Sequence, residues 1–378
     1  MTADDTRFTA VFRIHGDRDH ARSLAQAIAI EQSVEMPLAA ITDTRILTEV
    51  VGRVVGVHSV AEHLFEARIS LATETLDGSI GQFLNMLVGN SSFHASAELI
   101  DFDLPEPLLA SFPGPALGIP GLRKLANAPT RPLTLSNLKP QGLPADELAA
   151  IALCLARGGL DFIKDDHGLA NQRSAPFAER IAKVSAAVQT AANETGHLAH
   201  YLPNITGTLD DLRHQIDLVR RARLPGVMIM PMLVGLSTFA TITAENRDLL
   251  FLSHPAFGGR SPVGFSLLFG KLLRLLGADA TLFPTHGNRF GIPRDDTLSA
   301  AAMARAPLGS ALPALPIPAG GVRHDMLPSM IGDYGLDTML FLGGTLLASG
   351  SKLTADARLF TEAVETLATD RGPRTQAP

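Results

Sequence analysis

Four consecutive polar residues, Lys164, Asp165, Asp166 and His167, follow the run Leu-Asp-Phe-Ile in the segment GGLDFIKDDHGLANQ. A lysine buried beside two carboxylates is costly unless an ion pair, a metal ion or a reaction offsets the cost. Because side chains alternate along a strand, Lys164 and Asp166 would share one face, and Asp165 would lie on the other. His167 would join the pair only if the strand ends there and the chain turns, which Gly168 permits. We therefore expect a site at the end of this strand.

A lysine in this position has two chemical options. Beside acids it is stabilised as a cation, and in a partly buried site it can instead stay neutral and react with CO2 to give a carbamate. Carbamate and carboxylate oxygens together suit a hard cation such as Mg2+. The alternative interpretation is that Lys164 and an aspartate form a structural ion pair that caps the end of a barrel.

Short apolar runs alternate with helix-like stretches from residue 131 onward. Their number and spacing are typical of a (β/α)8 TIM barrel, and a doubly wound open sheet is the alternative. Polar, Gly or Pro clusters at the C-terminal ends of most runs favour the barrel, because barrel enzymes place their chemistry there. The runs are LTLSNLKP, DFIKDDH, AHYLPNIT, GVMIMPML, LLFLSHP, ATLFPTHG, ALPIPAGG and TMLFLGGT.

The N-terminal part has a different pattern. FTAVFRIHG, TRILTEVVGRVVGVHSVAEH and FEARISLATET alternate as strands do, and ARSLAQAIAIEQS has helical periodicity. We expect a small α+β, ferredoxin-like domain over residues 1–116 and the barrel domain over residues 117–378, with a disordered tail from about residue 369.

Composition limits the class of protein. The 378 residues are 46% hydrophobic and carry a net charge of −6, which gives no basic surface for nucleic acid or anionic lipid. The acidic N-terminus does not resemble a signal peptide, and the apolar stretch from Leu224 is broken by Pro225, Gly226 and Pro231, so we expect no membrane span. The single cysteine, Cys154, is expected to be a buried, inert thiol in a cytoplasmic protein.

At this point the chain resembles a known family. GGLDFIKDD is similar to the sequence around the activator lysine of RuBisCO large subunits, GGLDFTKDDE, and further motifs match in order along nearly the whole chain. The resemblance implies active-site roles for Glu31 in IEQSVEMP, Asn90 in LVGNSSF, Lys139 in NLKPQG and His254 in LSHPAFGGR, metal ligation by Lys164, Asp166 and His167, and phosphate binding by Gly320, Gly321, Gly343 and Gly344.

The departures from the family pattern exclude carboxylation. They are His167 in place of a metal-binding glutamate, Gln141 in place of the second lysine of KPK, Met36-Pro37 in place of Thr-Trp, and Pro255 and Gly258 within the HRxxxH motif. These losses remove groups needed for CO2 fixation and bisphosphate binding. The chain therefore resembles a RuBisCO-like protein. Imidazole is a poor ligand for Mg2+, so Mn2+ is an alternative to Mg2+ as the cation.

The substrate class follows from which phosphate site is retained. Glycine-rich turns expose backbone N–H groups and predict one phosphate cradle. The counterparts of the second phosphate site are Pro255, Leu282 and Ala319, an apolar wall where a dianion would be desolvated without a partner. A sugar monophosphate with one apolar end fits, such as 5-methylthioribulose 1-phosphate. Arg289 would either clamp the phosphate or be an ordinary surface arginine.

We therefore expect a metal-dependent enolising isomerase of methionine salvage, with Lys139 as the base. The alternatives are a 2,3-diketo-5-methylthiopentyl-1-phosphate enolase, a 3-oxo-sugar-acid-phosphate decarboxylase or, from another class, a non-catalytic regulatory or stress protein. The resemblance also implies a homodimer with shared active sites, because the family's counterpart of Glu31 reaches the partner's barrel. Lys139 has its own alternative role, contact with phosphate without proton transfer.

Overall fold

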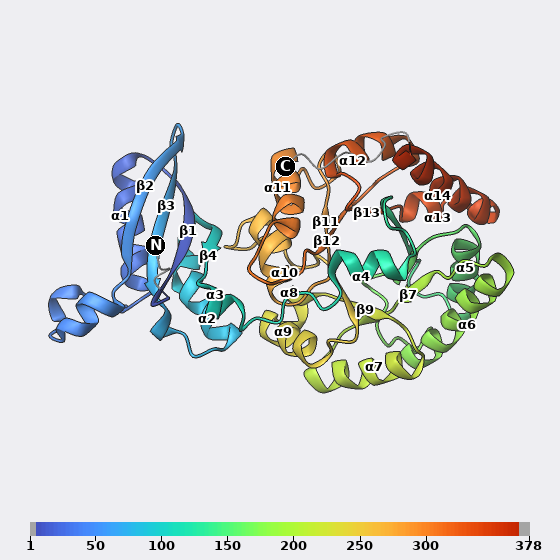
Figure 1. Cartoon of the computed structure of the whole chain (residues 1–378), viewed down its shortest axis with the longest axis horizontal. Helices are drawn as coiled ribbons and strands as arrows, with labels where there is room; N and C mark the ends of the chain where they lie inside the picture. The colour runs from blue at the N-terminus through green and yellow to red at the C-terminus, as the bar shows by residue number, and fades with distance from the viewer. Residues whose placement is uncertain (1–4, 370–378) are drawn as a thin grey trace. The chain divides into compact units, whose positions relative to one another are not determined.

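A computed structural model describes residues 5–369 and divides them into two compact units (Figure 1). Unit 1 runs to Pro113 and includes Gly258–Leu268 and Pro307–Ala311, and unit 2 holds the remaining described residues. Of the tail expected to be disordered, only Thr369 is described, and it ends a helix. No helix in the described part of the chain is long and apolar enough to cross a membrane.

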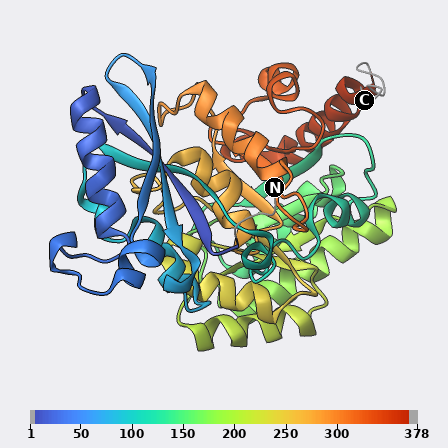
Figure 2. The ribbon, with the colours of Figure 1, turned by 60° about the vertical axis from the view of Figure 1, so that its left-hand side comes forward.

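Unit 1 is built on an antiparallel sheet with the strand order β2-β3-β1-β4. The chain order strand-helix-strand-strand-helix-strand is that of a ferredoxin-like domain, as expected. In Figure 2 the helix α1 lies along the sheet. The elements are β1 Arg7–His15, α1 Arg18–Glu31, β2 Arg53–Ala61, β3 Leu64–Ala72, α2 Ile80–Val88 and β4 Ala97–Asp103.

One predicted strand of unit 1 is partly wrong. The alternating segment from Thr44 begins as a π-helical turn, Ile46–Val50, and strand β2 starts only at Arg53. The Asp43 side chain accepts the backbone N–H of Arg45 at 2.8 Å and so starts a helical turn. No residue of Ile46–Val50 is buried, because the alternating pattern has no neighbouring strand to pack against here.

Unit 2 is a TIM barrel of parallel strands inside a ring of helices (Figure 1), which confirms the predicted fold class. Its strands are β5 Leu133–Leu138, β6 Phe162–Asp165, β7 His200–Leu202, β8 Asn204–Ile205, β9 Gly226–Ile229, β10 Leu250–Ser253, β11 Ala280–Pro284, β12 Leu315–Ala319 and β13 Met339–Phe341. Its main helices are α4 Gly118–Leu125, α5 Ala145–Arg157, α6 Phe177–Thr195, α7 Leu209–Arg221, α9 Leu236–Glu245, α11 Arg294–Arg305, α12 Leu327–Tyr334 and α14 Leu353–Thr369, with short helices α8 Pro231–Val234 and α13 Gly344–Leu347.

Prolines divide the strand ladder of the barrel into two arcs. One arc has the order β13-β5-β6-β7 and the other β12-β11-β10-β9-β8. Pro203 separates β7 from β8, so the predicted third strand is broken in two. On β12, the N–H of Leu315 points toward β11 and donates to Asp279 O. The alternate residues Pro316 and Pro318 face β13, and because proline has no N–H they cannot donate a hydrogen bond to that strand.

The inward-facing residues of each strand belong to the barrel core and, at the C-terminal strand ends, to the candidate site. The inward-facing residues Leu133 and Leu135 of β5, Phe162 of β6, and Leu250 and Leu252 of β10 belong to one buried apolar cluster. With a period of two, the same face continues at the C-terminal strand ends. It reaches Asn137 and Lys139 after β5, Lys164 and Asp166 after β6, and His254 after β10.

The opposite end of the barrel is closed by paired polar groups. The Asp279 carboxylate accepts the N–H groups of Leu117 and Gly118, which lead into α4, at 2.6 and 2.8 Å. His200 Nε2 lies 2.8 Å from Leu125 O on the same helix. The thiol of Cys154 is half-buried rather than buried as expected, because Cys154 lies beside the buried stripe of α5 instead of within it.

Candidate active site

The C-terminal ends of β5, β6 and β10 bring the predicted barrel residues together. Lys139 Nζ lies 3.0 Å from Asp166 Oδ2, and His167 Nδ1 lies 3.5 Å from Asp166 Oδ1. The imidazole rings of His167 and His254 stack with their centroids 4.5 Å apart and 14° between their planes. Asp166 is therefore the centre of the cluster, with two nitrogen groups directed at its carboxylate.

Lys164 is the most enclosed member of the cluster, with 1% of its surface exposed. Its Nζ donates to the backbone oxygen of Asp165 at 3.0 Å and lies 5.1 Å from the centre of the Phe341 ring. Burial lowers the pKa of the Lys164 amine to about 8, and the neighbouring Lys139 charge acts in the same direction. A substantial fraction of the amine is therefore neutral in mildly alkaline solution, which is the form that reacts with CO2.

Asp166 stays ionised in this setting. Burial opposes its ionisation, but hydrogen bonds from His167 and Lys139 hold the pKa of the carboxyl below its usual range. Asn137 Nδ2 donates a further hydrogen bond to Asp166 Oδ2 at 3.2 Å. The sequence prediction did not include Asn137, although its place two residues before Lys139 on an inward face would have indicated it.

His254 is neutral. Its pKa is lowered to about 2 by burial, then by the Lys164 and His167 charges. The backbone N–H of Ala256 donates to His254 Nδ1 at 3.2 Å, so the assigned tautomer carries its proton on Nε2. His254 can therefore offer an N–H to a substrate oxygen without adding positive charge.

A second set of buried groups forms hydrogen bonds to the end of β6 on the face opposite the cluster. Asp165, on the face opposite Lys164 and Asp166 as predicted, accepts Arg180 Nε at 3.0 Å, Tyr201 OH at 2.8 Å and the N–H of Asn204 at 3.0 Å. Arg180 also donates to Ala175 O at 2.7 Å. These contacts come from residues distant in the sequence, and no local pattern in the sequence predicts them.

The predicted phosphate turns follow β12 and β13. Gly320 and Gly321 have φ values of +99° and +81°, a backbone conformation that side chains other than glycine rarely adopt. A Cβ on Gly320 would lie 2.8 Å from Asn288 Nδ2, and one on Gly343 would lie 3.0 Å from Asn137 Oδ1. That Asn137 oxygen is buried and has no hydrogen-bond partner. The turns thus present bare backbone next to the cluster.

Arg289 lies on the loop after β11, with its guanidinium 4.9 Å from the centre of the exposed Phe290 ring. The base of this loop is held by His286, whose Nε2 lies 3.2 Å from Asp333 Oδ2 and whose Nδ1 lies 3.1 Å from Thr297 Oγ1. The predicted clamp is therefore mounted on an anchored loop, and its partner in the described structure is an aromatic ring.

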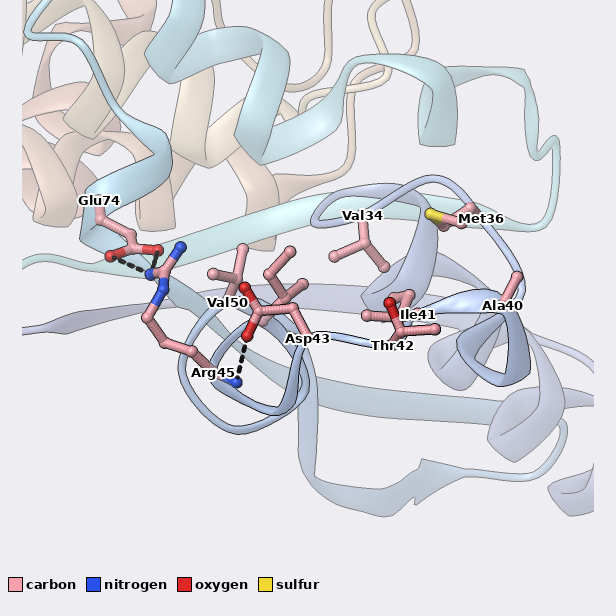
Figure 3. Close-up of a pocket in the computed structure, with 10 residues that line it drawn as sticks. Val34, Met36, Ala40, Ile41, Thr42, Asp43, Arg45, Val50 and Glu74 are labelled. Atoms are coloured by element: carbon pink, nitrogen blue, oxygen red, sulfur yellow. Dashed lines mark hydrogen bonds and ion pairs between the residues drawn. The ribbon is translucent and has the colours of Figure 1, made fainter.

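Glu31 and Asn90 lie in unit 1 and contact one another. Asn90 Nδ2 donates to Glu31 Oε1 at 2.8 Å and to Glu35 Oε1 at 3.1 Å. The segment that follows Glu31 lines an open pocket of about 530 Å³ (Figure 3). Its lining residues are Val34, Met36, Ala40, Ile41, Thr42, Asp43, Arg45, Ile46, Val50 and Glu74.

The donor groups of the barrel cluster fit a divalent cation only if Lys164 contributes. Among residues 5–369, no three His, Cys, Asp or Glu side chains form a group that could hold a metal ion. Asp166 and His167 are two donors, and a carbamate on the buried Lys164 amine would be the third. Two oxygen ligands and one imidazole form a mixed set that suits Mg2+ less well than Mn2+ or Zn2+.

Comparison with known proteins places this geometry in a family. Residues 118–377 match the model of the ribulose bisphosphate carboxylase large chain, catalytic domain. The 5-methylthioribulose-1-phosphate isomerase of Rhodospirillum rubrum is 45% identical over 359 residues, 95% of this chain and 96% of that protein. The 2,3-diketo-5-methylthiopentyl-1-phosphate enolase of Geobacillus kaustophilus is 31% identical over 82% of this chain and 77% of that protein. The crystal structure of a Rubisco-like protein from Rhodopseudomonas palustris is 42% identical and superposes with a TM-score of 0.89, covering 98% of this chain and 99% of that one.

Proposed function

The chain belongs to the ribulose bisphosphate carboxylase large-chain family, and on that premise we propose that it is an enolising isomerase of 5-methylthioribulose 1-phosphate in methionine salvage. The observation that carries the proposal is the cluster of Lys139, Lys164 and Asp166 beside the glycine turns. Similarity to the 5-methylthioribulose-1-phosphate isomerase of Rhodospirillum rubrum supports the same function. Gln141 and Pro255 stand where carboxylation needs cations, so CO2 is not a substrate.

Lys139 is the proposed base. Its side chain is 42% exposed at the mouth of the barrel, so its amine can reach a bound substrate. After losing its own proton, the amine removes a proton from the carbon next to the substrate carbonyl and returns it to the neighbouring carbon, which moves the carbonyl along the chain. The neutral His254 donates its Nε2–H to the oxygen that becomes negative in this step.

A divalent cation, Mg2+ or Mn2+, would be held by Asp166, His167 and a carbamate of Lys164. When bound, the cation would polarise the substrate carbonyl and stabilise the enediolate. Gly320, Gly321, Gly343 and Gly344 bind the phosphate through their backbone N–H groups, and Arg289 closes over it. We further propose a homodimer, in which Glu31 and Asn90 of each protomer complete the site of its partner.

A second candidate is the enolase reaction on 2,3-diketo-5-methylthiopentyl 1-phosphate, which the Geobacillus kaustophilus relative favours. Both reactions need the same proton abstraction and the same single phosphate. They differ in product, because the isomerase returns the proton to carbon and gives a new ketone, whereas the enolase returns it to oxygen and gives an enol.

The deciding experiment is NMR of 5-methylthioribulose 1-phosphate with the protein, Mg2+ and bicarbonate in D2O. New pentulose phosphates with deuterium at the exchanged carbon are the expected result. The Lys139→Met variant should be silent, and Lys183→Met, which removes a half-exposed lysine paired with Asp146 and Glu179 on the outer helices, should be fully active. Complete absence of deuterium uptake with the wild-type protein would refute the isomerase, and turnover of the diketo substrate would then establish the enolase.

A further inference from the structure

The loop that follows β6 is held by side-chain amides at three consecutive backbone carbonyls. Asn204 Nδ2 donates to His167 O at 3.1 Å and to Leu169 O at 2.8 Å. Between these two carbonyls, Gly168 O accepts Gln172 Nε2 at 2.6 Å. Residues 166–169 form neither helix nor strand, so the amides replace the backbone partners that regular secondary structure would supply to these carbonyls.

Asn204 is itself fixed by a buried network. It begins β8 directly after Pro203 and is fully buried. Its backbone N–H donates to Asp165 Oδ2 at 3.0 Å, and the same oxygen accepts Arg180 Nε at 3.0 Å. The other oxygen of this carboxylate accepts Tyr201 OH at 2.8 Å. The amide that contacts the loop is therefore attached to a network that joins β6, β7, β8 and α6.

The side-chain oxygen of Asn204 shows that this contact has a cost. Asn204 Oδ1 is buried and has no hydrogen-bond partner among residues 5–369. Turning the amide over would direct the oxygen at two carbonyl oxygens, so the NH2 group must face the loop. A leucine at this position would avoid a buried acceptor without a partner, but it would leave both carbonyls without their donor. A retained unsatisfied group calls for an explanation, and the contacts of Asn204 indicate the position of the loop.

The direction of the His167 imidazole depends on the backbone of this loop. Because 47% of the His167 side chain is exposed, packing alone does not fix the ring. Its Nδ1 lies 3.5 Å from Asp166 Oδ1, at the long end of the range for a hydrogen bond, and one face of the ring stacks on His254. The Asn204 amide holds the backbone of His167 on one side of these contacts and that of Leu169 on the other.

We propose that Asn204 is a positioning residue for the divalent cation, and that it directs the His167 imidazole through the backbone carbonyls of His167 and Leu169. This inference rests on the proposed function for the presence of a cation at the cluster. Groups that orient metal ligands typically contribute 10- to 100-fold to metal affinity. Imidazole suits Mn2+ better than Mg2+, so a displaced His167 weakens Mn2+ binding more than Mg2+ binding. Asn204 therefore also influences the choice between the two metals.

The test is titration of the full chain with Mn2+ in bicarbonate buffer, with free Mn2+ measured by EPR and Mg2+ added as a competitor. Asn204→Leu keeps a similar side-chain volume and removes both donors, so it should weaken Mn2+ binding by about 10- to 100-fold and Mg2+ binding by less. The matched control is Asn246→Leu. Asn246 is also buried, 4% exposed, and donates its Nδ2 to Ile242 O at 2.7 Å at the end of α9. Its loss should lower the urea midpoint but leave the Kd for Mn2+ within about twofold of the wild type.

A double-mutant cycle separates positioning of His167 from general loosening of the barrel. In a His167→Ala background, Asn204→Leu should change the Kd for Mn2+ by less than about twofold, because no imidazole is left to direct. Asn204→Ala removes the same donors from a smaller side chain and should shift Mn2+ affinity in the same direction, so the test does not depend on one variant folding. Equal losses with and without His167, or unchanged Mn2+ binding in both single variants, would overturn the proposal.

Metal binding is measured without substrate, which separates this inference from the proposed function. Mn2+ binding that depends on Asn204, without deuterium uptake from 5-methylthioribulose 1-phosphate, would keep the positioning role and refute the isomerase. Deuterium uptake with Mn2+ binding that does not depend on Asn204 would keep the isomerase and refute the positioning role. A wild-type protein that binds no Mn2+ would overturn the positioning role whatever the NMR experiment shows.

Discussion

The two ends of the barrel differ in whether their buried polar groups have hydrogen-bond partners. At the N-terminal end, Asp161 accepts both nitrogens of Arg131 at 2.7 and 2.8 Å and the N–H of Thr134 at 2.8 Å. At the C-terminal end, Lys164 is equally buried but donates only to a backbone oxygen, and Asn137 Oδ1 has no partner. One end satisfies its polar groups and stabilises the fold, whereas the other leaves them available for ligands and chemistry.

The largest expected effect is on turnover at the C-terminal end. Lys139→Met should lower kcat by about 10²- to 10⁴-fold, the contribution typical of a general base, in the NMR assay described above. Its ion pair with Asp166 is partly exposed, so the free energy of unfolding should change by less than about 1 kcal/mol. A loss of stability that accounts for the loss of activity would show that Lys139 is structural.

The next largest effect is on stability at the N-terminal end. Asp161→Ala leaves Arg131 without its bidentate partner and should cost about 3–5 kcal/mol of unfolding free energy, because it breaks a buried pair. Urea unfolding measures it, and Asp146→Ala, at an exposed ion pair, should stay within about 0.5 kcal/mol of the wild type. The turnover of the folded Asp161 variant should match that of the wild type, and a fall in kcat would contradict the division between the two ends.

A smaller effect is expected for Asn137→Ala. The side chain loses one hydrogen bond to Asp166, and its oxygen is already without a partner, so stability should fall by only about 1 kcal/mol. Its position between Asp166 and Gly343 should nonetheless make kcat/KM fall more than stability does. Equal turnover in the variant and the wild type would remove Asn137 from the site.

The smallest effect concerns pH at the N-terminal end. Burial lowers the pKa of His200 in the folded protein, so the unfolded chain binds a proton more readily at this residue. The stability due to neutral His200 is complete above the unfolded pKa of 6.5 and is lost as the pH falls below it. His200→Gln, which can still donate to Leu125 O, should flatten this part of the stability curve in urea unfolding from pH 7.5 to 5; an unchanged slope would exclude His200 as its source.

Local alternation was enough to predict much of this molecule. The barrel strands and the shared face of Lys164 and Asp166 follow from a period of two and from polar strand ends. Contacts between distant segments were not predictable in this way. Arg180 reaches Asp165 and Arg131 reaches Asp161 only after the chain has folded, and the left-handed φ of Phe257 leaves no trace in residue type. The segment from Thr44 failed because alternation predicts a strand only where another strand is available for pairing.

The prolines of β12 and Pro203 have a consequence for how the enzyme is divided. Lys139, Lys164 and Asp166 lie on strands of the arc β13-β5-β6-β7 or directly after them, whereas His254, Gly320 and Gly321 follow strands of the arc β12-β11-β10-β9-β8. The groups that the proposed reaction uses are therefore divided between two separately hydrogen-bonded halves of the barrel wall. The turns after β12 and β13 lie on either side of the break in the strand ladder at Pro316 and Pro318. A phosphate bound by both turns would therefore link the two halves of the barrel wall.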